Sequence, residues 1–84
     1  MKKLLSGEVT HFFAKIGVAV VTVSRDLKIG DRVSFEGATT DFMQGISSMQ
    51  VDKKEVASVS RGGQVGLKVE GKTRAGDSVY KLVA

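Results

Sequence analysis

The sequence predicts an all-β fold, either an antiparallel barrel or a sandwich, from three observations. The chain contains about six strand-length segments at regular spacing, as small all-β domains do. It contains no proline, and no segment keeps a long helical apolar period. A basic residue followed by glycine and a valine-led run occurs three times, at 28–33, 61–65 and 74–79. Each copy predicts a tight turn that feeds a strand, because glycine accepts positive φ and valine suits a pleated strand.

The first two strands are expected over 5–13 and 16–23. The first alternates loosely and places three apolar residues on one face, namely Leu5, Val9 and Phe13. The second is apolar on both faces, which is typical of a central strand. Its inward phase changes near Val20, and we expect a bulge there.

The next two strands are expected over 32–36 and 42–51. Clean alternation in the first places Val33 and Phe35 inward and Ser34 outward. The second is long and weakly patterned, and the out-of-phase apolar residues within it predict a bulge at Ser47-Ser48.

The last two strands are expected over 65–69 and 78–83, the second fed by the third glycine turn. The inward row of the first is Val65, Leu67 and Val69. A lone sheet of this size would expose two strand edges, whereas closure into a barrel removes them. We therefore favour a barrel.

Composition indicates one domain, residues 1–84, near the small end of what folds unaided. No apolar run approaches the roughly 20 residues of a membrane span. Polar Ser6 and Glu8 interrupt the short apolar start that a secretory signal would extend. The chain has no cysteine, so a disulfide framework and a thiolate metal site are excluded. We expect a cytoplasmic protein with no membrane partner.

The net charge of +4 is unevenly distributed. Basic residues exceed acidic ones in 1–25 and 60–84, and the reverse holds between them. If the first and last strands are neighbours, the two basic segments merge into one face suited to phosphate contacts. The candidate nucleic-acid-binding residues are Lys15, Lys68, Lys72 and Arg74. The alternative is that they are solvated side chains on outward strand positions.

The sequence assembles no catalytic constellation. His11 is the single histidine, so a hydrolase triad or a metal site would depend entirely on it. The glycines near 62–66 precede a strand and not a helix, and no P-loop motif occurs, so the chain is not expected to bind GTP itself. We expect no enzyme activity and no cofactor. Among the aromatic residues, Phe13 and Phe35 fit core positions, and Tyr80 is a candidate for base stacking. The favoured alternative is that Tyr80 is an amphipathic residue at the barrel rim.

The order of these elements resembles a known family. Segments 16–23, 27–33, 45–51 and 57–67, with the turn at 74–77, resemble the β-barrel domain that follows the GTPase domain in translation factors, known as domain II in elongation factor Tu and initiation factor two. The resemblance covers roughly residues 5–83 and extends to small stand-alone translation-elongation-factor-like proteins. Similar barrels end some collagenase-like peptidase family proteins. The resemblance implies a small closed six-stranded antiparallel Greek-key β-barrel of the translation-protein type.

Two functions follow as hypotheses from this resemblance and the charge distribution. The first is a non-catalytic module that contacts tRNA, rRNA or the ribosome through the basic face. The second is a protein-interaction accessory domain for a separate enzyme, such as an RNA-modifying or peptidase-like protein. The family's Gly-Arg-Val run is replaced here by Thr22–Asp26. In the translation factors this barrel helps to hold the acceptor end of tRNA, and we assign none of the residues of that pocket to positions of this sequence.

Overall fold

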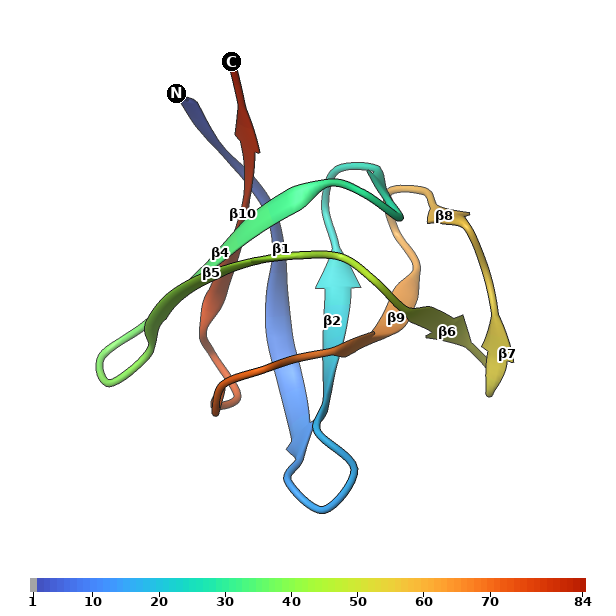
Figure 1. Cartoon of the computed structure of the whole chain (residues 1–84), viewed down its shortest axis with the longest axis horizontal. Helices are drawn as coiled ribbons and strands as arrows, with labels where there is room; N and C mark the ends of the chain where they lie inside the picture. The colour runs from blue at the N-terminus through green and yellow to red at the C-terminus, as the bar shows by residue number, and fades with distance from the viewer. Residues whose placement is uncertain (1) are drawn as a thin grey trace.

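The computed structural model describes residues 2–84, and these form antiparallel β-structure with no helix in that range (Figure 1). Eight strands make one curved sheet in the order β5-β4-β10-β1-β2-β9-β6-β7. Their bounds are β1 Lys2–Phe13, β2 Val18–Val23, β4 Arg32–Glu36, β5 Asp41–Gly45, β6 Met49–Val51, β7 Lys54–Glu55, β9 Gln64–Lys68 and β10 Ser78–Val83. A separate short pair joins β3, Leu27–Lys28, to β8, Ser58–Val59. The all-β antiparallel prediction is confirmed.

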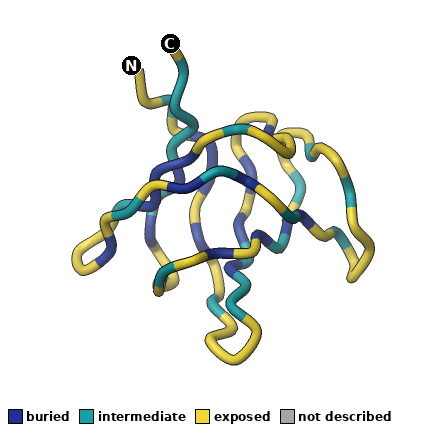
Figure 2. Tube along the Cα trace, viewed as in Figure 1, coloured by how far each residue is buried: buried dark blue, intermediate teal, exposed yellow. Residues whose placement is uncertain are grey.

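The curved sheet wraps around one apolar core, with exposed residues concentrated in the loops (Figure 2). The predicted inward residues of β4 and β9 are confirmed, since each is at most 6% exposed. They are Val33, Phe35, Val65 and Leu67, followed by Val69 just after β9. In β2 the alternation is regular, and Ala19, Val21 and Val23 are buried.

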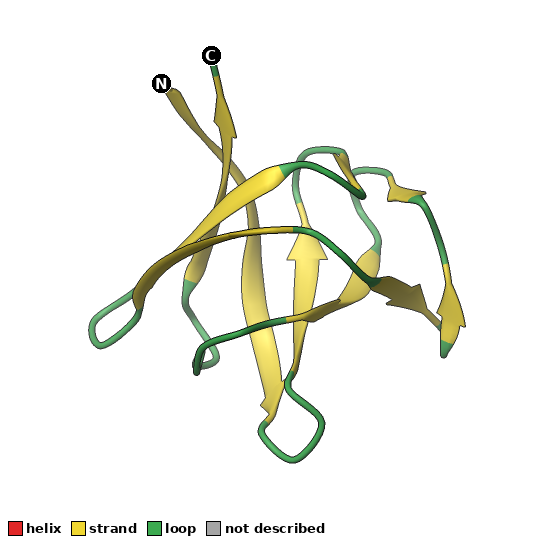
Figure 3. Ribbon diagram, viewed as in Figure 1, coloured by secondary structure: helices red, strands yellow, loops and turns green. Residues whose placement is uncertain are grey.

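The chain runs directly from β5, at one edge of the sheet, to β6 and β7 at the other edge (Figure 3). β5 pairs with β4, and β6 pairs with β9. The interruption between β5 and β6, at 46–48, contains the bulge position expected at Ser47-Ser48. The closed six-stranded barrel is not confirmed, because no backbone ladder joins β5 to β9 in the described chain.

The buried amide of Gln44 lies where that ladder is missing. Its Nε2 donates to the Lys68 carbonyl at 2.8 Å, and its Oε1 accepts from the Glu70 N–H at 2.8 Å. The side chain is 4% exposed, so these bonds replace water for groups that would otherwise be buried unpaired. A side chain thus links the β5 edge to the end of β9.

The three predicted glycine turns, which we call glycine corners, share one geometry. The φ angles of Gly30, Gly62 and Gly76 are 95°, 94° and 96°. In each corner the N–H of the residue after glycine donates to the carbonyl three residues earlier, as in a type II turn. These bonds are Asp31 to Lys28, Gly63 to Ser60 and Asp77 to Arg74, at 3.1, 3.4 and 3.0 Å. The three predicted glycine turns are confirmed.

Each corner also holds one buried residue of a neighbouring segment by two backbone hydrogen bonds. The glycine N–H donates to the carbonyl of that residue, whose own N–H donates to the carbonyl of the residue after glycine. The buried partners of Gly30, Gly62 and Gly76 are Ile46, Val23 and Val9, with bond lengths from 2.7 to 2.9 Å. The same short motif therefore fixes three core positions from distant parts of the chain.

Two irregularities in β1 correct the predicted face of that strand. Its register shifts between Leu5 and Gly7 against β10, and between Val9 and His11 against β2. Each shift changes the phase of the alternation. Val9 is therefore buried as expected, but Leu5 and Phe13 are 54% and 46% exposed and the prediction for both is wrong. The bulge expected near Val20 lies opposite it, in β1.

Ser34 was expected to face outward and is instead 1% exposed. It lies in β4 between β10 and β5, directly across from Tyr80 on one strand and Met43 on the other. Its hydroxyl donates to Glu36 Oε2 at 2.8 Å, so burial leaves no unpaired donor.

We expect Gln44→Leu to lower the free energy of unfolding by roughly 2–4 kcal/mol, because it leaves two backbone groups at the β5–β9 junction unpaired. Urea denaturation measures the change, and hydrogen exchange should show faster exchange of the Glu70 amide. The matched control is Gln50→Leu, at an exposed position of β6, which should change stability by less than about 0.5 kcal/mol. Equal effects of the two substitutions would contradict a structural role for the Gln44 amide.

Candidate functional site

The four basic residues predicted to contact phosphates are all exposed, as expected. Lys15 lies in the β1–β2 turn, Lys68 ends β9, and Lys72 and Arg74 lie in the β9–β10 connection. The turn and the connection both occupy the lower half of Figure 1, and the Val69 N–H donates to the Gly17 carbonyl between them. The expected pairing of the first and last strands is confirmed by the β1–β10 ladder.

A second basic cluster lies at the opposite end of the sheet and was missed by sequence reasoning. Arg25, Arg61 and Lys81 line one depression together with Leu4, Ser24, Asp26 and Val83, and we call this depression the basic cleft. Arg25 follows β2, Arg61 belongs to the Gly62 corner, and Lys81 lies in β10. The Gly62 corner brings the first two together, since it bonds to Val23 at the end of β2.

The acidic groups near the basic cleft already have partners. Asp26 Oδ1 accepts from the Arg61 backbone N–H at 3.1 Å, and Asp31 Oδ2 lies 3.4 Å from Lys81 Nζ. Within residues 2–84 the guanidinium groups of Arg25 and Arg61 make no ion pair. Guanidinium groups bind carboxylates and phosphates in a two-pronged geometry, so the cleft is suited to an anionic group.

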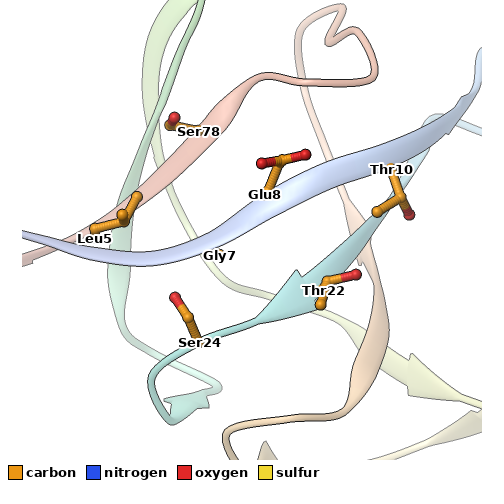
Figure 4. A pocket seen from close by; sticks show the side chains of 7 residues that line it. All are labelled: Leu5, Gly7, Glu8, Thr10, Thr22, Ser24 and Ser78. Atoms are coloured by element: carbon orange, nitrogen blue, oxygen red, sulfur yellow. The ribbon is translucent and has the colours of Figure 1, made fainter.

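A trough crosses the outer face of β10, β1 and β2 (Figure 4). Ser78, Glu8 and Thr22 lie directly opposite one another on the three strands, and Glu8 stands at the centre of the row. Beside it Gly7 is buried, and a Cβ there would lie 2.6 Å from Val21 Cγ1, so no larger residue fits at this position without a shift of the neighbouring atoms. Leu5, Thr10 and Ser24 complete the lining. One carboxylate among hydroxyl groups is suited to a hydrogen-bond donor or a cation.

The single histidine lines neither depression. His11 is exposed, its ring centroid lies 4.4 Å from that of Phe13, and its side chain makes no hydrogen bond within the described residues. Residues 2–84 hold no group of three or more His, Cys, Asp or Glu arranged to bind a metal ion. The same range has no helix long and apolar enough to cross a membrane.

An exposed ion pair occupies the outer face near the start of β1. Lys3 Nζ lies 2.6 Å from Glu36 Oε2. The hydrogen bond from Lys3 is the main cause that lowers the pKa of Glu36, with a further contribution from the Ser34 hydroxyl. The same bond raises the pKa of Lys3. Lys3 is therefore engaged with a partner, unlike the arginines of the basic cleft.

Comparison with known proteins identifies relatives among peptidase-like proteins. No protein-family model matches the sequence. The chain is 38% identical over 82 residues to the uncharacterised protease MJ0090 of Methanocaldococcus jannaschii. The matched segment covers 96% of this chain and 20% of that protein. This chain thus spans about a fifth of the curated relative it matches.

Solved structures show the same fold. The C-terminal domain of a Geobacillus thermoleovorans protein described as a U32 peptidase superposes with a TM-score of 0.89, at 22% identity, over 95% of this chain and 93% of that one. The selenomethionine form of that domain gives a TM-score of 0.85 at 23% identity, over 89% and 95%. The expected similarity to the C-terminal barrel of collagenase-like peptidase proteins is supported. The expected resemblance to the translation-factor domain is not supported by these relatives.

We expect Lys3→Gln to raise the pKa of Glu36 toward its ordinary value, since the Lys3 hydrogen bond is the main cause that lowers it. A carboxyl group whose pKa is lowered by folding stabilises the protein at pH values above its pKa in the unfolded state. This stabilisation is lost as the pH falls through its pKa in the folded state. The variant should therefore lose less stability on acidification than the parent. NMR titration of the Glu36 carboxyl carbon measures the shift, with Lys2→Gln as the matched control. Identical titration curves for the parent and Lys3→Gln would contradict the assignment.

Proposed function

We propose that this chain is a non-catalytic accessory domain that binds a separate peptidase-like protein. The observation that carries the proposal is the 38% identity along 96% of the chain to one fifth of a larger protein named as a protease. The fold of a C-terminal domain in a second peptidase-like protein supports it. In those relatives the domain is part of the same polypeptide.

The surface chemistry supports binding in place of catalysis. The side chains that line the two depressions include no histidine and no cysteine, and His11 lines neither of them. What they offer is charge, hydroxyl groups and aliphatic side chains on a folded sheet. Such a surface recognises a partner without reacting with it.

The RNA-binding hypothesis has less support. Phe35 and Phe42 stack on each other at 5.0 Å between ring centroids, and Phe12 packs against the core, so these three rings are not available to bases. Phe13 is exposed, and its ring packs on that of His11. None of the side chains in the basic cleft is aromatic. Single-stranded RNA binding generally combines basic groups with exposed stacking rings.

The proposal predicts that this chain binds the M. jannaschii protease MJ0090 from which the matching segment has been removed. The vacated surface should accept the homologous domain in a one-to-one complex, measured by calorimetry and light scattering. Intact MJ0090 is the control and should bind weakly, because its own segment occupies the site. A truncated protein shown by circular dichroism to be folded, yet unable to bind, would contradict the proposal.

If the truncated protease does not fold, a chimera replaces it. MJ0090 carrying this chain in place of its own segment should unfold in one cooperative thermal transition, because a docked domain is coupled to the rest of the protein. Two independent transitions, one of them matching the isolated 84-residue chain, would contradict docking.

A further inference from the structure

We propose that the basic cleft binds an acidic peptide segment of the peptidase-like partner, in which carboxylate side chains lie beside aliphatic ones. This inference deepens the proposed function and rests on it.

The position of the cleft points toward the partner. Leu4 near the start of β1 and Val83 at the end of β10 both line it, at the end of the sheet where the two termini lie (Figure 1). In a C-terminal domain of this fold, the preceding part of the protein joins at the first strand. The connection to the body of such a relative therefore leaves from the end of the sheet that carries the cleft, and we place a separate partner on the same side.

The charge of the cleft selects an anion. Three basic side chains line it against the single carboxylate of Asp26, which is bonded to the Arg61 backbone. Lys81 is also partly committed, because it lies 3.4 Å from Asp31. Arg25 and Arg61 remain as two guanidinium groups for carboxylates of the partner.

The apolar part of the lining favours a peptide over RNA. Leu4 and Val83 are partly buried aliphatic residues beside the basic groups, and they suit an aliphatic side chain next to a carboxylate. Bases would find no aromatic ring to stack on among the lining residues.

Both arginines stand on backbone that is already fixed. The Arg25 N–H donates to the Ser6 carbonyl, and the neighbouring Ser24 N–H donates to the same oxygen at 2.8 Å. Arg61 precedes Gly62, whose N–H donates to the Val23 carbonyl at 2.7 Å. Binding therefore orders side chains but not loops, which lowers its entropic cost.

The test compares two double variants with the same change in net charge. Arg25→Glu/Arg61→Glu reverses the charge of two residues in the cleft. Lys68→Glu/Lys72→Glu reverses the charge of two exposed residues at the opposite end of the sheet. The probe is a fluorescently labelled peptide carrying Glu-Leu-Glu-Leu between Gly-Ser ends, with Gln in place of Glu as its control. We expect the cleft variant to bind the acidic peptide about tenfold or more weakly than the parent, and the opposite-end variant to match the parent. Circular dichroism checks the fold, and Arg25→Gln/Arg61→Gln replaces the cleft variant if that one does not fold.

Three results would overturn the inference. Equal weakening by the two double variants would show charge attraction without a site. Equal binding of the Glu and Gln peptides would show that the cleft does not recognise the carboxylates of the peptide. Displacement of the peptide by a single-stranded oligouridylate at lower concentration than by unlabelled peptide would assign the cleft to RNA.

The truncated protease MJ0090 separates this inference from the proposed function. If it binds the parent and the cleft variant equally, the accessory function stands and the cleft assignment fails. If it binds neither while the acidic peptide still binds only the parent, the accessory function fails and the cleft remains a site for acidic peptides.

Discussion

The fold depends on a backbone conformation that only glycine adopts at little cost. Gly30, Gly62 and Gly76 all have φ near 95°, where a side chain costs roughly 1–2 kcal/mol. Because the chain turns this way, each glycine and the residue after it present an N–H and a carbonyl side by side to a neighbouring segment. Each of these N–H and carbonyl pairs bonds to the backbone of one core residue. A local turn thus fixes a contact between segments that are distant in the sequence.

The same corners determine where the functional groups lie. The Gly62 corner bonds to Val23 and thereby places Arg61 next to the loop that carries Arg25. The Gly30 corner ends in Asp31, which lies within ion-pair distance of Lys81 in β10. The three basic residues of the cleft thus come from three segments that backbone contacts bring together. Two aspartates beside them are already bonded, Asp26 to the Arg61 backbone and Asp31 to Lys81.

Local features of this fold were predictable from the sequence, and non-local ones were not. The glycine turns and the inward rows of β4 and β9 follow from residue types at short spacing. The exposure of Leu5 and Phe13 follows from register shifts in β1, which depend on strands that pair with it from both ends of the chain. The basic cleft was missed for the same reason, because Arg25 and Arg61 meet only through the Gly62 corner. The repeat of that corner was visible in the sequence, but its partner strand was not.

The most direct test of this account is native-state hydrogen exchange at Val9, Val23 and Ile46, the three residues that the corners hold. We expect their amides to exchange only through global unfolding, with opening free energies equal to the free energy of unfolding measured by denaturation. Exchange of these amides at the rate of exposed loop residues would show that the corners do not hold the core, and would contradict the account.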